Sequence, residues 1–178
     1  MLSGRGVLLP IQQVALRVLA DVPDQAAFYL TGGTALSEFY LGHRLSFDLD
    51  MFTVEAPLVL PFSRQVEQRF AAEGWGVKVA RRFQHYVEIV VYKEAGSLRI
   101  DFAWDTPHRF APPVLSAYGI YVNDWDDLVA EKVLAYYGRA EPRDAVDLYF
   151  LLEKEPLERL LRLAAEKDCG FARYWFAI

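Results

Sequence analysis

The spacing of hydrophobic residues divides the chain into helical and extended segments. Over residues 11–21, apolar side chains recur every three or four positions, which predicts an amphipathic helix. A second helix is predicted over residues 57–73 and should end at Gly74. A shorter helix is expected over residues 34–40, closed near Gly42.

Five short segments are predicted to be strands. Their apolar residues either alternate with polar residues or form short runs between turn residues. The segments cover residues 28–30, 47–54, 75–83, 86–92 and 98–104. The last three are consecutive and are separated only by turns.

The last third of the chain is predicted to be helical. After a proline-rich loop over residues 106–116, three helices are expected, at residues 124–137, 143–153 and 156–167. Strands followed by helices favour an α+β fold, in which a mixed sheet is flanked by helices. We divide the chain into a core of residues 1–122 and a helical segment of residues 123–178 packed on that core; the two could also be counted as one domain.

Composition limits the classes of protein to consider. One cysteine, Cys169, excludes an internal disulfide and fits a reducing cytoplasm, and no apolar run is long enough to span a membrane. The formal net charge of -5 argues against a nonspecific nucleic-acid binder, although a nucleotide or RNA could still be bound locally. The apolar tail, residues 171–178, should dock on the domain or form part of an interface.

The most informative segment joins a diglycine to two acids. Gly32 and Gly33 follow a short apolar strand and precede a predicted helix, where backbone N–H groups can approach a phosphate. Asp48 and Asp50 lie two residues apart on the next predicted strand, so they project from one face, about 6–7 Å apart along it. This spacing suits divalent cations held together with phosphate oxygens. Either half alone could be an ordinary turn or a solvated strand face.

This block resembles the signature of the DNA polymerase beta-like nucleotidyltransferase superfamily: Gly32-Gly33-Thr34-Ala35-Leu36, then Gly42-His43-Arg44-x-Ser46-x-Asp48-Leu49-Asp50-x-Phe52. More narrowly, it is similar to the AbiEii/AbiGii toxin family, the toxin half of a class of bacterial toxin–antitoxin and phage-defence modules. The resemblance implies that Asp48 and Asp50 are catalytic ligands of Mg²⁺ (or Mn²⁺). It also implies contacts to a nucleoside triphosphate from residues around the acids: Gly32, Gly33, Thr34, Arg44 and Ser46.

A third carboxylate is expected at Asp101. It lies in the middle of the strand over residues 98–104, among apolar neighbours, where an acid is costly to bury unless it is paired or bound to metal. One interpretation is an ion pair with a neighbouring arginine. The superfamily carries a third carboxylate on a later strand, which makes Asp101 a metal ligand and a candidate general base for the attacking hydroxyl. Asp105, at the end of the strand, is the weaker candidate.

The C-terminal helices carry further candidates for the nucleotide site. Lys132 and Arg139 share one helical face, where they could simply be surface cations with partly buried stems. The family resemblance instead places such a lysine and arginine at the phosphates of the nucleotide. The run Arg143-Asp144-Ala145-Val146-Asp147-Leu148-Tyr149 resembles another family motif, in which Asp144 has the stronger claim to a site role.

A small basic group on the predicted strands is the candidate contact to an RNA backbone. It consists of Lys78, Arg81 and Arg82, which could equally form a solvated face. The chain also departs from the family pattern, because little follows the Asp144 motif and position 99 is Arg where relatives often have Lys. From the family resemblance we therefore expect parts of an acceptor-binding surface to be either missing or supplied by a partner.

Together these features predict a cytoplasmic, magnesium-dependent nucleotidyltransferase that acts as the toxin of a toxin–antitoxin system. It would move a nucleotidyl group from a nucleoside triphosphate to an acceptor hydroxyl, with the 3′ end of tRNA as the first acceptor to test and a cognate antitoxin as its partner. One alternative is a minimal nucleotidyltransferase antitoxin that transfers AMP to a protein. The other is an inactive nucleotide-binding or interaction module.

Overall fold

The computed structural model describes residues 1–94 and 96–176, and it confirms the predicted α+β class. The chain consists of two compact units. The first comprises Met1–Pro107 and Pro113–Asn123, and the second comprises His108–Pro112 and the chain from Asp124 onward. Within the described residues, no helix is long and apolar enough to cross a membrane.

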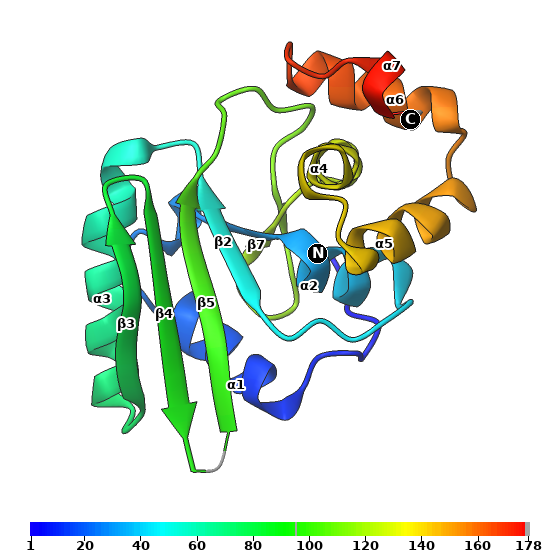
Figure 1. Ribbon diagram of the computed structural model, residues 1–178. Helices are drawn as coiled ribbons and strands as arrows, with labels where there is room; N and C mark the ends of the chain where they lie inside the picture. The colour runs from blue at the N-terminus through cyan, green and yellow to red at the C-terminus, as the bar shows by residue number, and fades with distance from the viewer. Residues whose placement is uncertain (95, 177–178) are drawn as a thin grey trace. The chain divides into compact units, whose positions relative to one another are not determined.

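The first unit is built on a mixed seven-stranded sheet with the order β3-β4-β5-β2-β1-β7-β6 (Figure 1). The pairs β2–β5 and β1–β7 are parallel, and the other neighbouring strands are antiparallel. The strands are β1 (Tyr29–Thr31), β2 (Leu49–Thr53), β3 (Gly76–Phe83), β4 (Tyr86–Lys93), β5 (Gly96–Trp104), β6 (Val114–Leu115) and β7 (Tyr121–Val122).

All five predicted strands are present, and two short ones were not predicted. The loop expected over residues 106–116 is wrong at its end, where β6 begins at Val114. A two-residue strand is too short to show an alternating pattern, so only its pairing defines it. The strand expected over residues 47–54 begins at Leu49, which leaves Asp48 just before it.

Two helices cover one face of this sheet, α1 (Pro10–Ala20) and α3 (Val59–Ala72) (Figure 1). Beneath them the rings of Phe28 and Phe62 stack with centroids 3.8 Å apart, and Phe102 of β5 meets both edge-on. Burial of such aromatic and aliphatic side chains is the main stabilising contribution to this core. Because side chains alternate along a strand, Asp50 of β2 and Arg99 and Asp101 of β5 point to the opposite face.

The remaining helical segments of the first unit are short. Helix α2 (Gly32–Ala35) continues directly into a π-helical segment, η2 (Leu36–Leu41), in agreement with the short helix expected there. Two 3₁₀ turns, η1 (Gln25–Ala27) and η3 (Ala56–Leu58), precede β1 and α3.

The second unit contains the predicted C-terminal helices, α4 (Trp125–Arg139), α5 (Pro142–Leu152) and α6 (Leu157–Lys167), and a short α7 (Arg173–Phe176). Asp124 caps α4, because its side chain accepts a hydrogen bond from the backbone N–H of Asp126.

The apolar tail docks within this second unit. The ring of Phe171 lies 5.0 Å from that of Tyr137, and the ring of Phe176 lies 5.8 Å from that of Tyr136. Both tyrosines belong to α4. The end of the predicted apolar tail, residues 177 and 178, lies outside the described residues.

Candidate functional site

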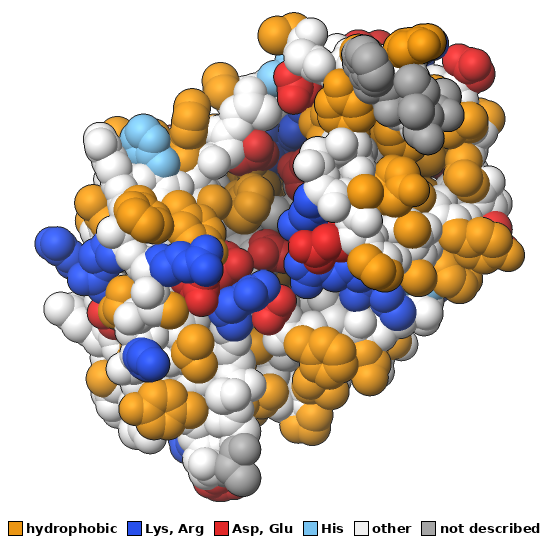
Figure 2. Space-filling model, in the orientation of Figure 1, with side chains coloured by type: hydrophobic (Ala, Val, Ile, Leu, Met, Phe, Trp, Pro, Cys, Tyr) orange, Lys and Arg blue, Asp and Glu red, His pale blue; other side chains and the backbone are white. Residues whose placement is uncertain are grey.

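Five polar residues form one line across the face of the sheet opposite α1 and α3, which we call the open face. The strand register pairs Thr31 with Asp50, Asp50 with Asp101, Asp101 with Glu88, and Glu88 with Arg81. Neighbouring strands are about 4.8 Å apart, so the carboxylates of Asp50 and Asp101 project side by side. In the space-filling view, acidic and basic side chains gather beside one another over β3–β5 (Figure 2).

The diglycine lies directly against this line. Gly32 has φ +70°, and a Cβ there would lie 2.0 Å from Oδ2 of Asp50. A Cβ on Gly33 would lie 2.7 Å from Nη2 of Arg44 and 2.8 Å from Oγ of Ser46. A larger residue at either position would displace these side chains. The fold therefore brings the two halves of the sequence motif together.

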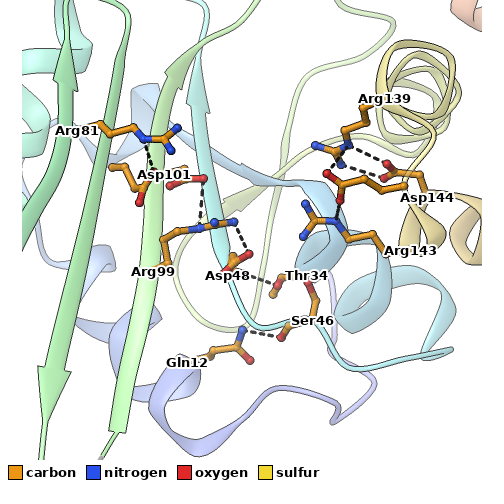
Figure 3. Close-up of polar contacts among 12 residues, drawn as sticks. Gln12, Thr34, Ser46, Asp48, Arg81, Arg99, Asp101, Arg139, Arg143 and Asp144 are labelled. Atoms are coloured by element: carbon orange, nitrogen blue, oxygen red, sulfur yellow. Dashed lines mark hydrogen bonds and ion pairs between the residues drawn. The ribbon is translucent and has the colours of Figure 1, made fainter.

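Asp48 lies just before β2, where Arg99 and Thr34 contact it. Its carboxylate pairs with the guanidinium of Arg99, and its backbone carbonyl accepts a hydrogen bond from Oγ1 of Thr34 at 2.5 Å (Figure 3). Nε of Arg99 also lies 3.6 Å from Oδ2 of Asp101. Arg99 therefore bridges two of the three predicted carboxylates, as the ion-pair interpretation of Asp101 expected.

Asp101 is a largely buried acid with a raised pKa. Its side chain is 11% exposed, and within the described residues its Oδ1 is buried without a hydrogen-bond partner. Burial, and then the nearby charge of Asp50, raise the pKa of Asp101 to about 6, although Arg99 opposes the shift. The surroundings therefore disfavour the ionised form of Asp101.

Two residues beside Asp101 were missed by the sequence analysis. Glu88 of β4 pairs in register with Asp101, and the hydroxyl of Tyr86 donates a hydrogen bond to Oε2 of Glu88 at 3.2 Å. Burial, Asp101 and Glu88 raise the pKa of Tyr86, so its hydroxyl stays protonated and available as a donor. Only the alternation of β4 could have placed both side chains on one face; their position beside Asp101 depends on the register.

Replacing Asp101 by Asn is expected to stabilise the metal-free protein at pH 8, by about 1–3 kcal/mol at about 1.4 kcal/mol per pKa unit. The pKa of Asp101 is about 6 in the folded protein, above the value of about 3.9 in an unfolded chain. The folded state therefore binds the proton more tightly, and this acid destabilises the fold above pH 6 and ceases to do so as the pH falls towards 4.

Urea unfolding of wild type and Asp101→Asn in EDTA at pH 8 and pH 4 measures this effect. The stabilisation by Asn should be present at pH 8 and nearly absent at pH 4. An equal change in unfolding free energy at both pH values would contradict the electrostatic explanation.

The pair Asp50 and Asp101 fits a divalent cation, because the two carboxylates project side by side from adjacent strands and the charge of Asp50 raises the pKa of Asp101. The predicted third ligand, Asp48, is paired with Arg99. Among residues 1–94 and 96–176, no three His, Cys, Asp or Glu side chains are gathered as in a metal site. Carboxylate oxygens are nevertheless the donors that Mg²⁺ and Mn²⁺ prefer.

The second unit contains a buried charge cluster of Lys132, Asp144 and Asp147, and Arg139, whose side chain is 46% exposed, lies at its edge. Nζ of Lys132 lies 2.9 Å from Asp147 and 3.8 Å from Asp144, and Lys132 is only 5% exposed. The alternative that Lys132 is a surface cation is therefore wrong. Arg139 grips Asp144 through two hydrogen bonds, of 2.7 and 2.9 Å (Figure 3).

Asp144 is central to this cluster. Burial would raise its pKa, but the hydrogen bonds from Arg139 and the charge of Lys132 outweigh burial and lower it. Asp144 is therefore ionised at neutral pH and aligns both basic residues.

Comparison with known proteins gives consistent results. The model of the family described as "Nucleotidyl transferase AbiEii toxin, Type IV TA system" matches residues 14–173. An uncharacterized protein of Aquifex aeolicus is 30% identical over 160 residues, which cover 88% of this chain and 73% of that protein.

Two solved structures share the fold. JHP933 from Helicobacter pylori has a TM-score of 0.61 and 20% identity, over 87% of this chain and 68% of its own. The nucleotidyltransferase toxin MenT4 from Mycobacterium tuberculosis has a TM-score of 0.61 and 23% identity, over 88% of this chain and 64% of its own. At these identities the likeness concerns the fold.

Proposed function

Since the chain belongs to the AbiEii nucleotidyl transferase toxin family of type IV toxin–antitoxin systems, we propose that it transfers a nucleotidyl group from a nucleoside triphosphate to the 3′ hydroxyl of an RNA, with tRNA as the acceptor. The observation that carries the proposal is the pair Asp50 and Asp101, in register on adjacent parallel strands and next to the diglycine. In this arrangement a candidate phosphate-binding turn, the diglycine, lies next to a candidate cation site, the acid pair.

Asp50 and Asp101 would hold Mg²⁺ (or Mn²⁺), with Asp48 as the third carboxylate. When bound, the ion would neutralise the charge of the triphosphate and lower the pKa of the attacking hydroxyl. Arg99 compensates part of the negative charge of Asp48 and Asp101 in the metal-free protein. The three acids are therefore tolerated on one surface before a substrate binds.

In the transfer step, the 3′ oxygen of the acceptor forms a bond to the α-phosphorus, and the bond from that phosphorus to the pyrophosphate oxygen breaks. The hydroxyl proton moves to the carboxylate of Asp101, whose pKa is raised to about 6 by burial and by the charge of Asp50. Glu88 lies beside this carboxylate in the strand register and accepts a hydrogen bond from the hydroxyl of Tyr86.

The nucleotide would be bound by the diglycine segment and by the residues that precede β2. Backbone N–H groups would come from Gly32, Gly33 and Thr34, and the two glycines lack the Cβ that would obstruct a phosphate. Arg44 and Ser46 lie against Gly33. In the second unit we assign Lys132 and Arg139 to the phosphates, with Asp144 holding both cations in place. We further propose that the protein acts in the cytoplasm and that a cognate antitoxin restrains it.

A transfer assay tests this function. Purified protein is incubated with Mg²⁺, each α-labelled nucleoside triphosphate in turn, and total tRNA, with an EDTA control. Label in RNA that disappears with EDTA is the expected result. Label on a protein instead would support the alternative of a minimal nucleotidyltransferase antitoxin. Nucleotide binding without label on any acceptor would support an inactive binding module.

A further inference from the structure

The edge strand β3 carries basic and aromatic side chains on the face that holds Asp101. Lys78 pairs in register with Val90, which pairs with Arg99, and Phe83 pairs with Tyr86. Directly opposed residues on neighbouring antiparallel strands project to the same side of a sheet. Lys78, Arg81 and Phe83 therefore share the open face with the acids of the candidate site.

An irregularity in β3 decides which arginine belongs to this face. The pairing with β4 shifts between Val79 and Arg81, as in a β-bulge. Without that shift, alternation would place Arg82 on the same side as Lys78. Instead Arg82 points to the other face and pairs with Glu67 of α3. The basic group predicted from the sequence is therefore corrected: Arg82 does not belong with Lys78 and Arg81.

Arg81 is held by an ion pair with Glu88, yet its side chain is largely exposed. Its Nε lies 3.5 Å from Oε2 of Glu88, while 65% of its side chain remains exposed (Figure 3). Since β3 and β5 are separated by one strand, Arg81 is about 10 Å from Asp101 across the sheet. A phosphate bound by Arg81 would thus lie within a few nucleotides of an attacking hydroxyl at Asp101.

Two exposed aromatic rings flank the basic side chains. Phe83 is 62% exposed, and Tyr92 is 48% exposed with its ring against the backbone of Gly76, where a Cβ would lie 1.9 Å from a ring atom. Large exposed rings on a sheet that also presents cations are typical of surfaces that bind single-stranded nucleic acid by stacking and phosphate contacts.

From this placement we propose that the open face of β3, β4 and β5 binds the single-stranded 3′ end of the RNA acceptor. Arg81 and Lys78 contact its phosphates, and Phe83 and Tyr92 stack on its bases. This proposal rests on the proposed function. The chain has a net charge of -5, and this face also carries Asp50, Asp101 and Glu88. The positive charge available to RNA therefore lies at the sheet edge, where β3 presents Lys78 and Arg81.

Fluorescence anisotropy with a 5′-fluorescein-labelled, single-stranded RNA 12-mer tests the proposal independently of catalysis. The double variant Arg81→Ala, Phe83→Ala should bind this RNA at least about tenfold more weakly than wild type. Arg82→Ala is the matched control, because it removes the same charge one residue away on the other face, and its affinity should stay within about twofold of wild type. Both variants should retain wild-type melting temperatures and nucleoside triphosphate affinity.

The outcomes separate this proposal from the proposed function. Equal weakening by both variants, or none by the double variant, would overturn the assignment of the face even if the wild type transfers nucleotides to RNA. RNA binding that depends on Arg81 and Phe83, in a wild-type protein that transfers no label, would support the face and count against the transfer. A wild type that labels only protein and does not bind the RNA would overturn both.

Discussion

Replacing Asp50 or Asp101 by Asn is expected to reduce nucleotide transfer at least about a thousandfold, or about 4 kcal/mol in transition-state free energy. Each substitution keeps the shape of the side chain but removes a charge from the pair that would hold the cation. Initial rates with saturating nucleoside triphosphate and RNA measure the loss, and expression in cells tests whether toxicity disappears with it.

Asp105→Asn is the control for this pair. Asp105 follows β5 and accepts a hydrogen bond from the hydroxyl of Tyr29 at 2.7 Å, so it tests a carboxylate close in sequence but engaged elsewhere. This variant should keep most of the transfer rate. Full activity in a folded Asp50→Asn, Asp101→Asn double variant would refute the assigned chemistry. If Asp105→Asn were the only inactive variant, the third acid would have been assigned to the wrong position.

The local parts of the site could be predicted from the sequence. A diglycine and an acid pair lie within 19 residues of one another, and the turn and strand that carry them have strong local signals. The approach of Gly32 to Asp50 follows once β1 and β2 pair. Which face of a strand is polar could also be predicted, because alternation depends only on the strand itself.

Long-range features could not be predicted in this way. Asp48 was predicted inside the strand but lies just before β2, because the pairing of β2 with β1 and β5, rather than composition, determines where the strand begins. The bulge in β3 exchanges the sheet faces to which Arg81 and Arg82 project, and no residue type in β3 predicts this bulge. Glu88 and Tyr86 join the site only through the register of β4 with β5.

Burial of Lys132 was likewise invisible in the helical pattern. Its charge is compatible with the edge of an apolar stripe, and the two acids that neutralise it come from the following helix. This burial changes how a loss of activity in a Lys132 variant should be understood, because stability and nucleotide binding both depend on the same ammonium group.

Lys132→Met is therefore expected to destabilise the protein by about 3–5 kcal/mol, since it leaves Asp144 and Asp147 buried with one fewer cation. Urea unfolding followed by circular dichroism measures the change. Lys154→Met, at an exposed lysine, is the control and should change the unfolding free energy by less than about 0.5 kcal/mol.

Adding Asp147→Asn to Lys132→Met removes the carboxylate closest to the missing ammonium, so it should recover part of the lost stability. Nucleotide affinity of this double variant is then informative, because the fold is no longer the limiting factor. Affinity that stays weak in a folded double variant supports a contact between Lys132 and the phosphates. Wild-type affinity would mean that Lys132 serves only to neutralise the buried acids, which would leave Arg139, aligned by Asp144, as the phosphate contact of the second unit.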